Sequence, residues 1–464
     1  MENSNLYRLV RSFSAVEQRE VRKFLLSPFF NQRQDLVTLF DCLVKGITLQ
    51  KEQVWRHLAG HKPYDDQRMR LLMSYLNGLL EQYLAIREWS ADPVRVQLHT
   101  AIAFRQRHMN ESFERTRKSI EKTLAAQPLR NAAYYETIQR LQWEAHQVAY
   151  PQTPTDVTRL QELSGTTDVT YLAQKLQLIC LLTAHQSVYH GGAGAEWEAE
   201  VIARAESAEY AGIPAITIYL HCYRMLRQSN GEIHFQQFKH MLLEQAACFS
   251  EAEMHGFYIL AVNYCVRRLN AGDNRFYTEV LELYKAGLET GYLFEDGVLT
   301  RFTYHNIVAA GIHAGELDWV RFFINEYKSR LEKRYRESAF SFNLARLEYA
   351  QRNYGFVLEL LQKANYRDPL INLTAKTLLL KTYYDLGELD LLQSHLDAMR
   401  NYIHRKRVLG YHRTNFLNII RYMEKIIRLN AWDKASAESL RTALENEAVL
   451  TEKGFFLKIL PVSQ

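Results

Sequence analysis

The sequence is poor in the residues that interrupt helices. Its 464 residues include only 20 glycines and 9 prolines. Such a composition favours helices joined by short turns and leaves little room for folds built on frequent tight turns. We therefore expect an all-α protein.

Cysteines are few, and long apolar runs are missing. The cysteines are Cys42, Cys180, Cys222, Cys248 and Cys265. No two of them form a Cys-x-x-Cys pair, which is typical of reduced structural thiols in the cytosol. No apolar run approaches the length of about 18 residues that suggests a membrane span, and the first residues lack the apolar stretch of a signal peptide. These absences predict a cytoplasmic protein with no membrane partner.

Motifs for catalysis and for metal binding are missing as well. The sequence has no Gly-x-Ser-x-Gly nucleophile elbow, no phosphate-binding loop, no His-Glu-x-x-His motif and no EF-hand loop. His221 and Cys222 are neighbours that face different directions on a helix, whereas a zinc site needs three or four converging ligands. We expect no catalytic residues, no metal and no cofactor, and therefore a protein that is not an enzyme.

What the sequence does contain is a recurring turn. Leu378 to Leu392 has the pattern of a helix end, a tight turn at Gly387-Glu388-Leu389-Asp390 and a new helix start. Gly315-Glu316-Leu317-Asp318 repeats this turn, and Gly231-Glu232-Ile233 repeats part of it. Turn markers recur every 35 to 43 residues between Asn110 and Asn430. This spacing is typical of stacked helix pairs, in which each pair buries its apolar stripe against the next.

The helix starts fit the same pattern. Ser14 with Glu17, and Ser250 with Glu253, have the spacing of capping boxes. Asp368-Pro369 predicts a capped helix with proline at its first position. Before the repeats, residues 1–92 predict a separate helical unit. The stripe Leu72, Leu76, Leu79, Tyr83 and Ile86 is expected to form the buried face of its longest helix.

Residues 297–400 resemble tetratricopeptide repeats. The resemblance rests on the order of apolar pair, aromatic residue and turn in Leu344-Ala345 with Arg352-Asn353-Tyr354, and in Leu379, Tyr383 and Gly387. It implies a right-handed α-solenoid, which we expect to have about nine helix hairpins. The opening segment, residues 24–31 with 62–66, also resembles a group of uncharacterised bacterial proteins, which brings no activity with it.

The expected organisation has three parts. Residues 1–92 form the N-terminal helical unit, residues 93–447 the solenoid, and residues 448–464 an apolar tail that packs on the last repeat, because a solenoid end must be covered.

The resemblance also implies which polar side chains face the concave groove of the solenoid. They are His305, Asn306, Asn343, Arg346, Lys381 and Arg421. Amide and cationic groups in such a groove can hold a peptide backbone or a carboxylate. The main prediction is therefore a scaffold or adaptor that binds a protein or peptide partner in its groove, with ordinary polar groove residues as the alternative.

A second interpretation uses a basic patch. Residues 400–428 carry a net charge of +7, while the whole chain carries +5. The patch residues are Arg400, Arg405, Lys406, Arg407, Arg413 and Arg428. Its cations could attract an acidic protein segment or RNA, and interleaved tyrosines could stack on bases. This patch therefore predicts a nucleic-acid-associated or regulatory protein as the alternative function, and composition does not separate an acidic protein partner from RNA. A smaller cluster, residues 328–336, carries +4. Solvated helix ends remain an open alternative for both.

The N-terminal unit offers one more alternative. A short helix over residues 51–58, followed by a helix with Arg68 and Arg70, could be a helix-turn-helix. The connection is longer than usual for that motif, so a capping bundle is the other interpretation.

Overall fold

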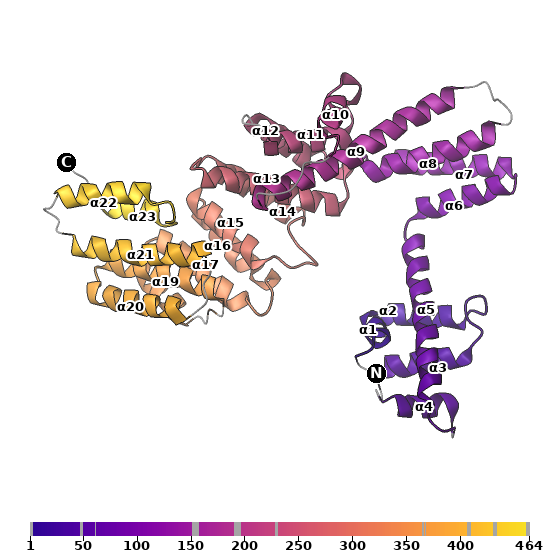
Figure 1. The fold of residues 1–464 in the computed structure, drawn as a ribbon, viewed down its shortest axis with the longest axis horizontal. Coiled ribbons are helices and arrows are strands. Elements are labelled where there is room, and N and C mark those ends of the chain that lie inside the picture. Colours follow the sequence, from indigo (N-terminus) through magenta and orange to yellow (C-terminus); the bar gives the residue numbers. More distant parts are fainter. Residues whose placement is uncertain are drawn as a thin grey trace. The chain divides into compact units, whose positions relative to one another are not determined.

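The computed structural model describes residues 3–46, 50–60, 62–150, 157–189, 196–227, 231–363, 366, 368–405, 410–429 and 434–460. Within these ranges the chain forms 23 α-helices and three short 3-10 helices, and no β-strand (Figure 1). The prediction of an all-α protein is confirmed. In the same ranges, every helix is too short or too polar to cross a lipid bilayer.

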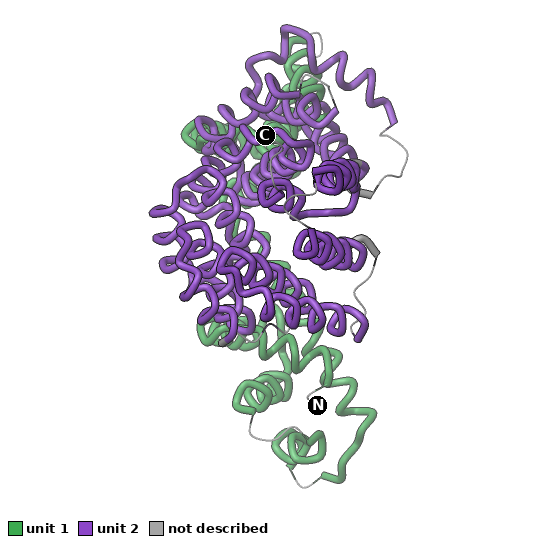
Figure 2. The backbone as a smooth tube through the Cα atoms, turned by 90° about the vertical axis from the view of Figure 1, so that its left-hand side faces the viewer, with its two compact units in different colours: residues 1–171 green, residues 172–464 purple. Residues whose placement is uncertain are grey.

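The chain divides into two compact units, residues 1–171 and residues 172–464 (Figure 2). Unit 1 contains α1 (Asn5–Ser12), α2 (Ala15–Leu26), α3 (Gln34–Lys45), α4 (Lys51–Ala59), α5 (Asp66–Ser90), α6 (Pro93–Gln106), α7 (Asn110–Ala126) and α8 (Ala132–Ala149). The long helix α9 (Thr158–Tyr189) runs through the division between the units.

Unit 2 continues the series of helices. Its elements are α10 (Glu198–Ala205), η1 (Ala208–Tyr210), α11 (Pro214–Arg227), α12 (Gly231–Glu244), η2 (Ala246–Cys248), α13 (Glu251–Asn270), α14 (Phe276–Glu289), α15 (Arg301–His313), α16 (Leu317–Glu326), η3 (Tyr327–Arg330), α17 (Arg336–Ala350), α18 (Tyr354–Lys363), α19 (Pro369–Leu386), α20 (Leu389–Arg405), α21 (Gly410–Arg428), α22 (Lys434–Asn446) and α23 (Lys453–Ile459). From α10 to α21, the main contacts join each helix to the next one or to the next but one.

The helix starts confirm the predicted caps. The Ser14 hydroxyl accepts from the Glu17 amide at 3.3 Å, and the Glu17 carboxylate accepts from the Ser14 amide at 2.7 Å. Ser250 and Glu253 form the same capping box at α13. Asp368 caps α19, and proline occupies the first turn of that helix. These local interactions satisfy amide groups that the helix itself leaves free.

Four of the nine predicted turn markers are confirmed. Gly272, Gly315 and Gly387 have φ values of +90°, +80° and +75° between consecutive helices, a conformation that glycine adopts without steric cost. Arg352 takes the same role with φ of +62°. Asn110 and Gly231 instead begin α7 and α12. Residues 151, 191, 192 and 430 lie outside the described ranges.

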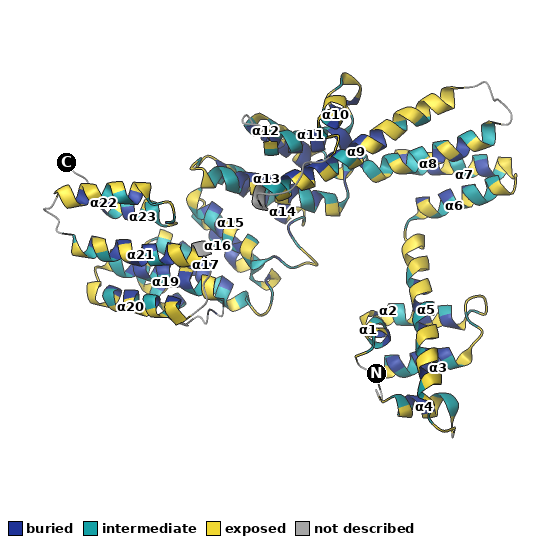
Figure 3. Cartoon of the chain, in the orientation of Figure 1, coloured by how far each residue is buried: buried dark blue, intermediate teal, exposed yellow. Residues whose placement is uncertain are grey.

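The first five helices enclose their own core. Leu72, Leu76, Leu80 and Tyr83 of α5 are buried in a cluster with residues of α1 to α4. The predicted stripe is therefore partly wrong: Leu79 is only partly buried, and Ile86 is 39% exposed. Tyr83 is the last fully buried position of this cluster along α5, and Leu84 packs against it. Residues 85–90 at the end of α5 are exposed (Figure 3).

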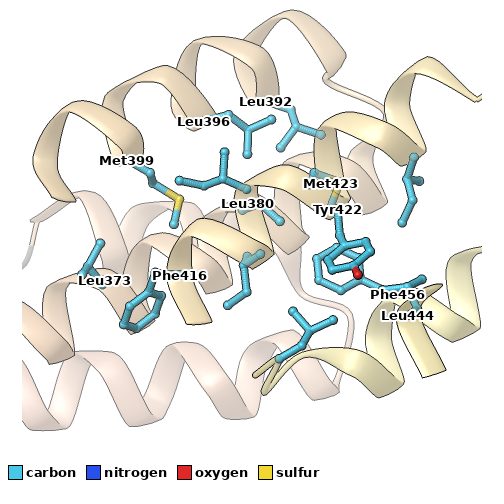
Figure 4. Packing of buried hydrophobic residues seen from close by; sticks show 14 of the residues in the cluster. Leu373, Leu380, Leu392, Leu396, Met399, Phe416, Tyr422, Met423, Leu444 and Phe456 are labelled. Atoms are coloured by element: carbon cyan, nitrogen blue, oxygen red, sulfur yellow. The ribbon is translucent and has the colours of Figure 1, made fainter. Parts of the chain in front are cut away.

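The largest core of the C-terminal helices joins α19 to α23. Figure 4 shows Leu380, Leu396 and Met423 in one buried cluster with Phe456 of α23. Phe456 is completely buried, and Leu460 is 2% exposed. Each such side chain stabilises the fold by roughly 1.5–3 kcal/mol, so α23 is an integral part of this core.

All five cysteines are free. Cys180, Cys222 and Cys265 are buried in unit 2, and the Cys180 thiol donates to the Tyr219 carbonyl at 3.2 Å. Burial raises the pKa of the Cys265 thiol. These three residues act as small apolar side chains in the core.

Candidate partner-binding site

The six residues predicted to line a groove lie on four helices of unit 2: His305 and Asn306 on α15, Asn343 and Arg346 on α17, Lys381 on α19, and Arg421 on α21. The structure joins His305, Asn343 and Arg346 in one hydrogen-bonded group. It gives Lys381 and Arg421 acidic partners from the C-terminal end of the described chain. Asn306 is exposed.

The first group is centred on Asn343, which is completely buried. Its amide nitrogen donates to the Ala339 carbonyl at 2.8 Å and contacts His305 Nδ1 at 2.7 Å. Because an amide nitrogen only donates, Nδ1 of His305 accepts and the ring is neutral. Burial lowers the pKa of His305 to about 4. Asn343 therefore holds the ring and does not itself reach the surface.

Arg346 completes this group. Its guanidinium donates to the His305 carbonyl at 3.0 Å and lies 3.5 Å from the Asn343 side-chain oxygen. Among the described residues, no carboxylate approaches it within ion-pairing distance. Burial lowers the pKa of Arg346, and the charge of Glu452 opposes that change. A half-buried cation without a carboxylate is unusual, since desolvation of an unpaired charge is costly.

Lys381 has a partner. Its ammonium contacts the Glu452 carboxylate at 2.9 Å, and the two side chains are 18% and 27% exposed. The same ammonium lies over the rings of Tyr349, at 5.2 Å, and Phe455, at 5.1 Å. Carboxylate and aromatic contacts together hold the lysine on α19.

Arg421 is paired in the same manner. Its guanidinium contacts the Glu447 carboxylate at 2.6 Å. The Tyr422 hydroxyl donates to the same carboxylate at 3.1 Å. Burial acts to raise the pKa of Glu447, but hydrogen bonds from the Val449 amide, Tyr422 and Arg421 lower it overall. Glu447 is therefore held as a carboxylate.

The backbone between these two glutamates is also held. We call residues 447–452, which lie between α22 and α23, the acidic segment. The Asn415 side-chain oxygen accepts from the Thr451 amide at 2.8 Å, and the Asn418 amide nitrogen donates to the Val449 carbonyl at 2.9 Å. Both asparagines lie on α21 and are buried. Helix α21 thus binds this non-helical segment through its main chain.

Sequence reasoning identified Arg421 but missed Asn415 and Asn418. The spacing of three residues between them was the available signal, because positions three apart share a helix face. Nothing in the sequence pairs Glu447 with Arg421 or Glu452 with Lys381, since these contacts depend on tertiary packing.

The residues of the predicted basic patch differ in whether they form ion pairs. Arg400 pairs with Asp397 at 3.0 Å and with Glu424. Arg405, Arg413 and Arg428 are exposed, and no carboxylate among the described residues pairs with them. Lys406 and Arg407 lie outside the described residues.

In the N-terminal unit, α4 and α5 are joined by residues 60–65, of which His61 is not described. The Trp55 indole donates to the Pro63 carbonyl at 2.9 Å, and Lys51 pairs with Asp66 at 3.0 Å. Arg70 pairs with Asp66 as well, while Arg68 is exposed. The helix-turn-helix interpretation stays a prediction.

Comparison of the chain with family models, with curated proteins and with solved structures finds no match. The candidate site therefore depends on its own geometry.

Proposed function

We propose that this chain is a non-enzymatic α-solenoid scaffold that binds an acidic segment of a protein partner along α15 and α17. The contacts between consecutive helices of unit 2 support the solenoid part of this proposal, because helix pairs in such an array touch only their neighbours. The partner-binding part rests on how residues 447–452 of this chain are bound by their neighbouring helices.

The observation that carries the proposal is how α19 and α21 hold residues 447–452. Two cations take two carboxylates, and two asparagines take the main chain of a non-helical stretch. Directed bonds to backbone and carboxylate are the contacts by which helical repeats would hold a peptide. These helices thus already bind an acidic peptide, one that belongs to the same chain.

Helix α17 offers one further cation of this kind. Arg346 is fixed by the His305 carbonyl and Asn343, and no described carboxylate lies within ion-pairing distance of it. A carboxylate from a partner would restore the ion pair that burial otherwise makes costly. Lys381 and Arg421 are occupied by Glu452 and Glu447, so we assign the partner site to Arg346.

A randomised peptide display library tests the proposal with the full chain as bait. We expect enrichment of peptides with Asp or Glu, and loss of that enrichment in Arg346→Gln. Arg115→Gln, which removes an exposed arginine of α7, is the matched control and should leave the enrichment unchanged. Enrichment of peptides without acidic residues, or equal enrichment by Arg346→Gln, would contradict the proposal.

The second candidate function is nucleic-acid binding. It is favoured by the exposed Arg405, Arg413 and Arg428, which have no carboxylate partner among the described residues. A single-stranded RNA oligonucleotide would then bind with an affinity that falls with salt by a slope of about 0.7 per phosphate contact. Arg413→Gln together with Arg428→Gln should reduce this slope. A flat salt response would eliminate the candidate.

A further inference from the structure

A second site lies away from Arg346, in the turn region between α14 and α17. A cavity of about 630 Å³ opens there. It is lined by residues of α14, of the 294–298 loop, of η3 and of the start of α17. Its volume falls in the range of roughly 300–1,000 Å³ that is typical of small-molecule sites.

The cations around this cavity divide into two groups. Of the five in residues 328–336, Lys328 pairs with Glu337 at 2.9 Å and Arg334 pairs with Glu332 at 3.4 Å. The other three, Arg330, Lys333 and Arg336, have no carboxylate partner among the described residues. Those three line the cavity, whereas Lys328 and Arg334 do not.

One of the three cations is fixed in place. Arg336 donates to the Ser329 carbonyl at 2.7 Å and to the Leu331 carbonyl at 3.0 Å. Its Nε atom is buried without a hydrogen-bond partner. Arg336 is also the first residue of α17, whose N-cap residue, Tyr335, makes no side-chain capping bond. The positive end of the helix dipole therefore adds to the three positive side chains.

The rest of the lining sets limits on the ligand. Glu326 and Glu332 are the two carboxylates in the lining, and Glu332 is held by Arg334. Leu288, Phe294 and Val298 provide an apolar wall, and the Arg330 guanidinium lies 5.6 Å from the Phe294 ring centre. This combination suits an anionic group attached to an apolar body.

We propose that this cavity binds a phosphate monoester of metabolite size. Arg330, Lys333 and Arg336 take the phosphate, since cations form strong charge-assisted hydrogen bonds with its oxygens. The wall of Leu288, Phe294 and Val298 takes the organic part. This site is independent of the peptide site at Arg346, because the two share no residue.

Isothermal titration of the full chain at constant ionic strength tests the proposal, with inorganic phosphate and phenyl phosphate as probes. We expect saturable one-to-one binding of both, and tighter binding of phenyl phosphate because of the apolar wall. Arg330→Gln and Lys333→Gln should each weaken binding by roughly tenfold, as expected for the loss of one charged hydrogen bond. Both side chains are exposed, so the fold should tolerate these changes.

Lys328→Gln is the matched control. It removes the same charge from the same cluster, and neither Lys328 nor its partner Glu337 lines the cavity, so screening limits its effect to about threefold or less. Absence of saturable binding would overturn the proposal. An equal loss in Lys328→Gln would also overturn it, because the cluster would then attract anions only through its general charge. Equal affinity for the two probes would refute the role of the apolar wall.

Discussion

The Lys381 ammonium lies 2.9 Å from the Glu452 carboxylate, which joins α19 to a residue 71 positions further along the chain. With the Arg421–Glu447 pair, this contact holds the acidic segment against α19 and α21. Lys381 and Arg421 thus differ from Arg346, which has no carboxylate partner within ion-pairing distance among the described residues.

Glu452→Gln should loosen the C-terminal helix. The substitution leaves Lys381 half-buried without its counter-ion, and we expect a loss of about 1–3 kcal/mol in the local opening free energy. Native-state hydrogen exchange of the amides in α23 measures this quantity. Glu445→Gln changes an exposed glutamate nearby and should leave the exchange unchanged. Equal exchange in both variants would show that the pair contributes nothing.

Acid should weaken the attachment of the acidic segment. The pKa of Glu447 in the folded protein is below its ordinary value of 4.5, so its contribution to stability is complete above pH 4.5 and is lost as the pH falls further. The difference in α23 exchange between wild type and Glu447→Gln should therefore be largest near neutral pH and shrink in acid. A difference that does not depend on pH would contradict this assignment.

His305 should make unfolding easier in mild acid. Its pKa is lowered by burial to about 4, against an ordinary 6.5, so the unfolded chain binds a proton that the folded chain does not. Stability is complete above pH 6.5 and falls towards pH 4, by at most about 1.4 kcal/mol per pH unit. An NMR titration of the imidazole signal measures the pKa directly, and His305→Asn identifies that signal. A midpoint near 6.5 would exclude a buried ring.

Two glycine substitutions should change the free energy of unfolding in opposite directions. In Gly311→Ala the added carbon would collide with the Val320 side chain where α15 packs on α16, and we expect a loss of about 1–3 kcal/mol. In Gly256→Ala, within α13, the added carbon meets no atom within 4 Å. Alanine should therefore stabilise that helix by roughly 0.5–1 kcal/mol. The change in melting temperature of each variant gives the sign of its effect on stability. A Gly311→Ala variant that is more stable than the wild type would contradict the packing of α15 on α16.

The helix limits were predictable because their causes are local. Ser14 with Glu17, and Asp368 before proline, satisfy amides within the same turn. Gly315 and Gly387 provide the left-handed turn conformation without any distant contact. Each of these features can be recognised in a few neighbouring residues.

The features that sequence reasoning missed depend on packing. Leu80 is fully buried in the core of α1 to α5, whereas the predicted Leu79 packs against that core only in part. The contacts of Glu447 and Glu452 cross 26 and 71 residues. Periodicity shows which face of a helix is polar, but it does not show which distant segment lies on that face.

The buried thiols of unit 2 can report local opening of the structure. An alkylating reagent attacks only an exposed thiolate, and Cys180, Cys222 and Cys265 are shielded in the native protein. Their modification rates therefore record how often α9, α11 and α13 separate, without any added label. Cys42 and Cys248, which are partly exposed, supply the internal reference for reagent reactivity.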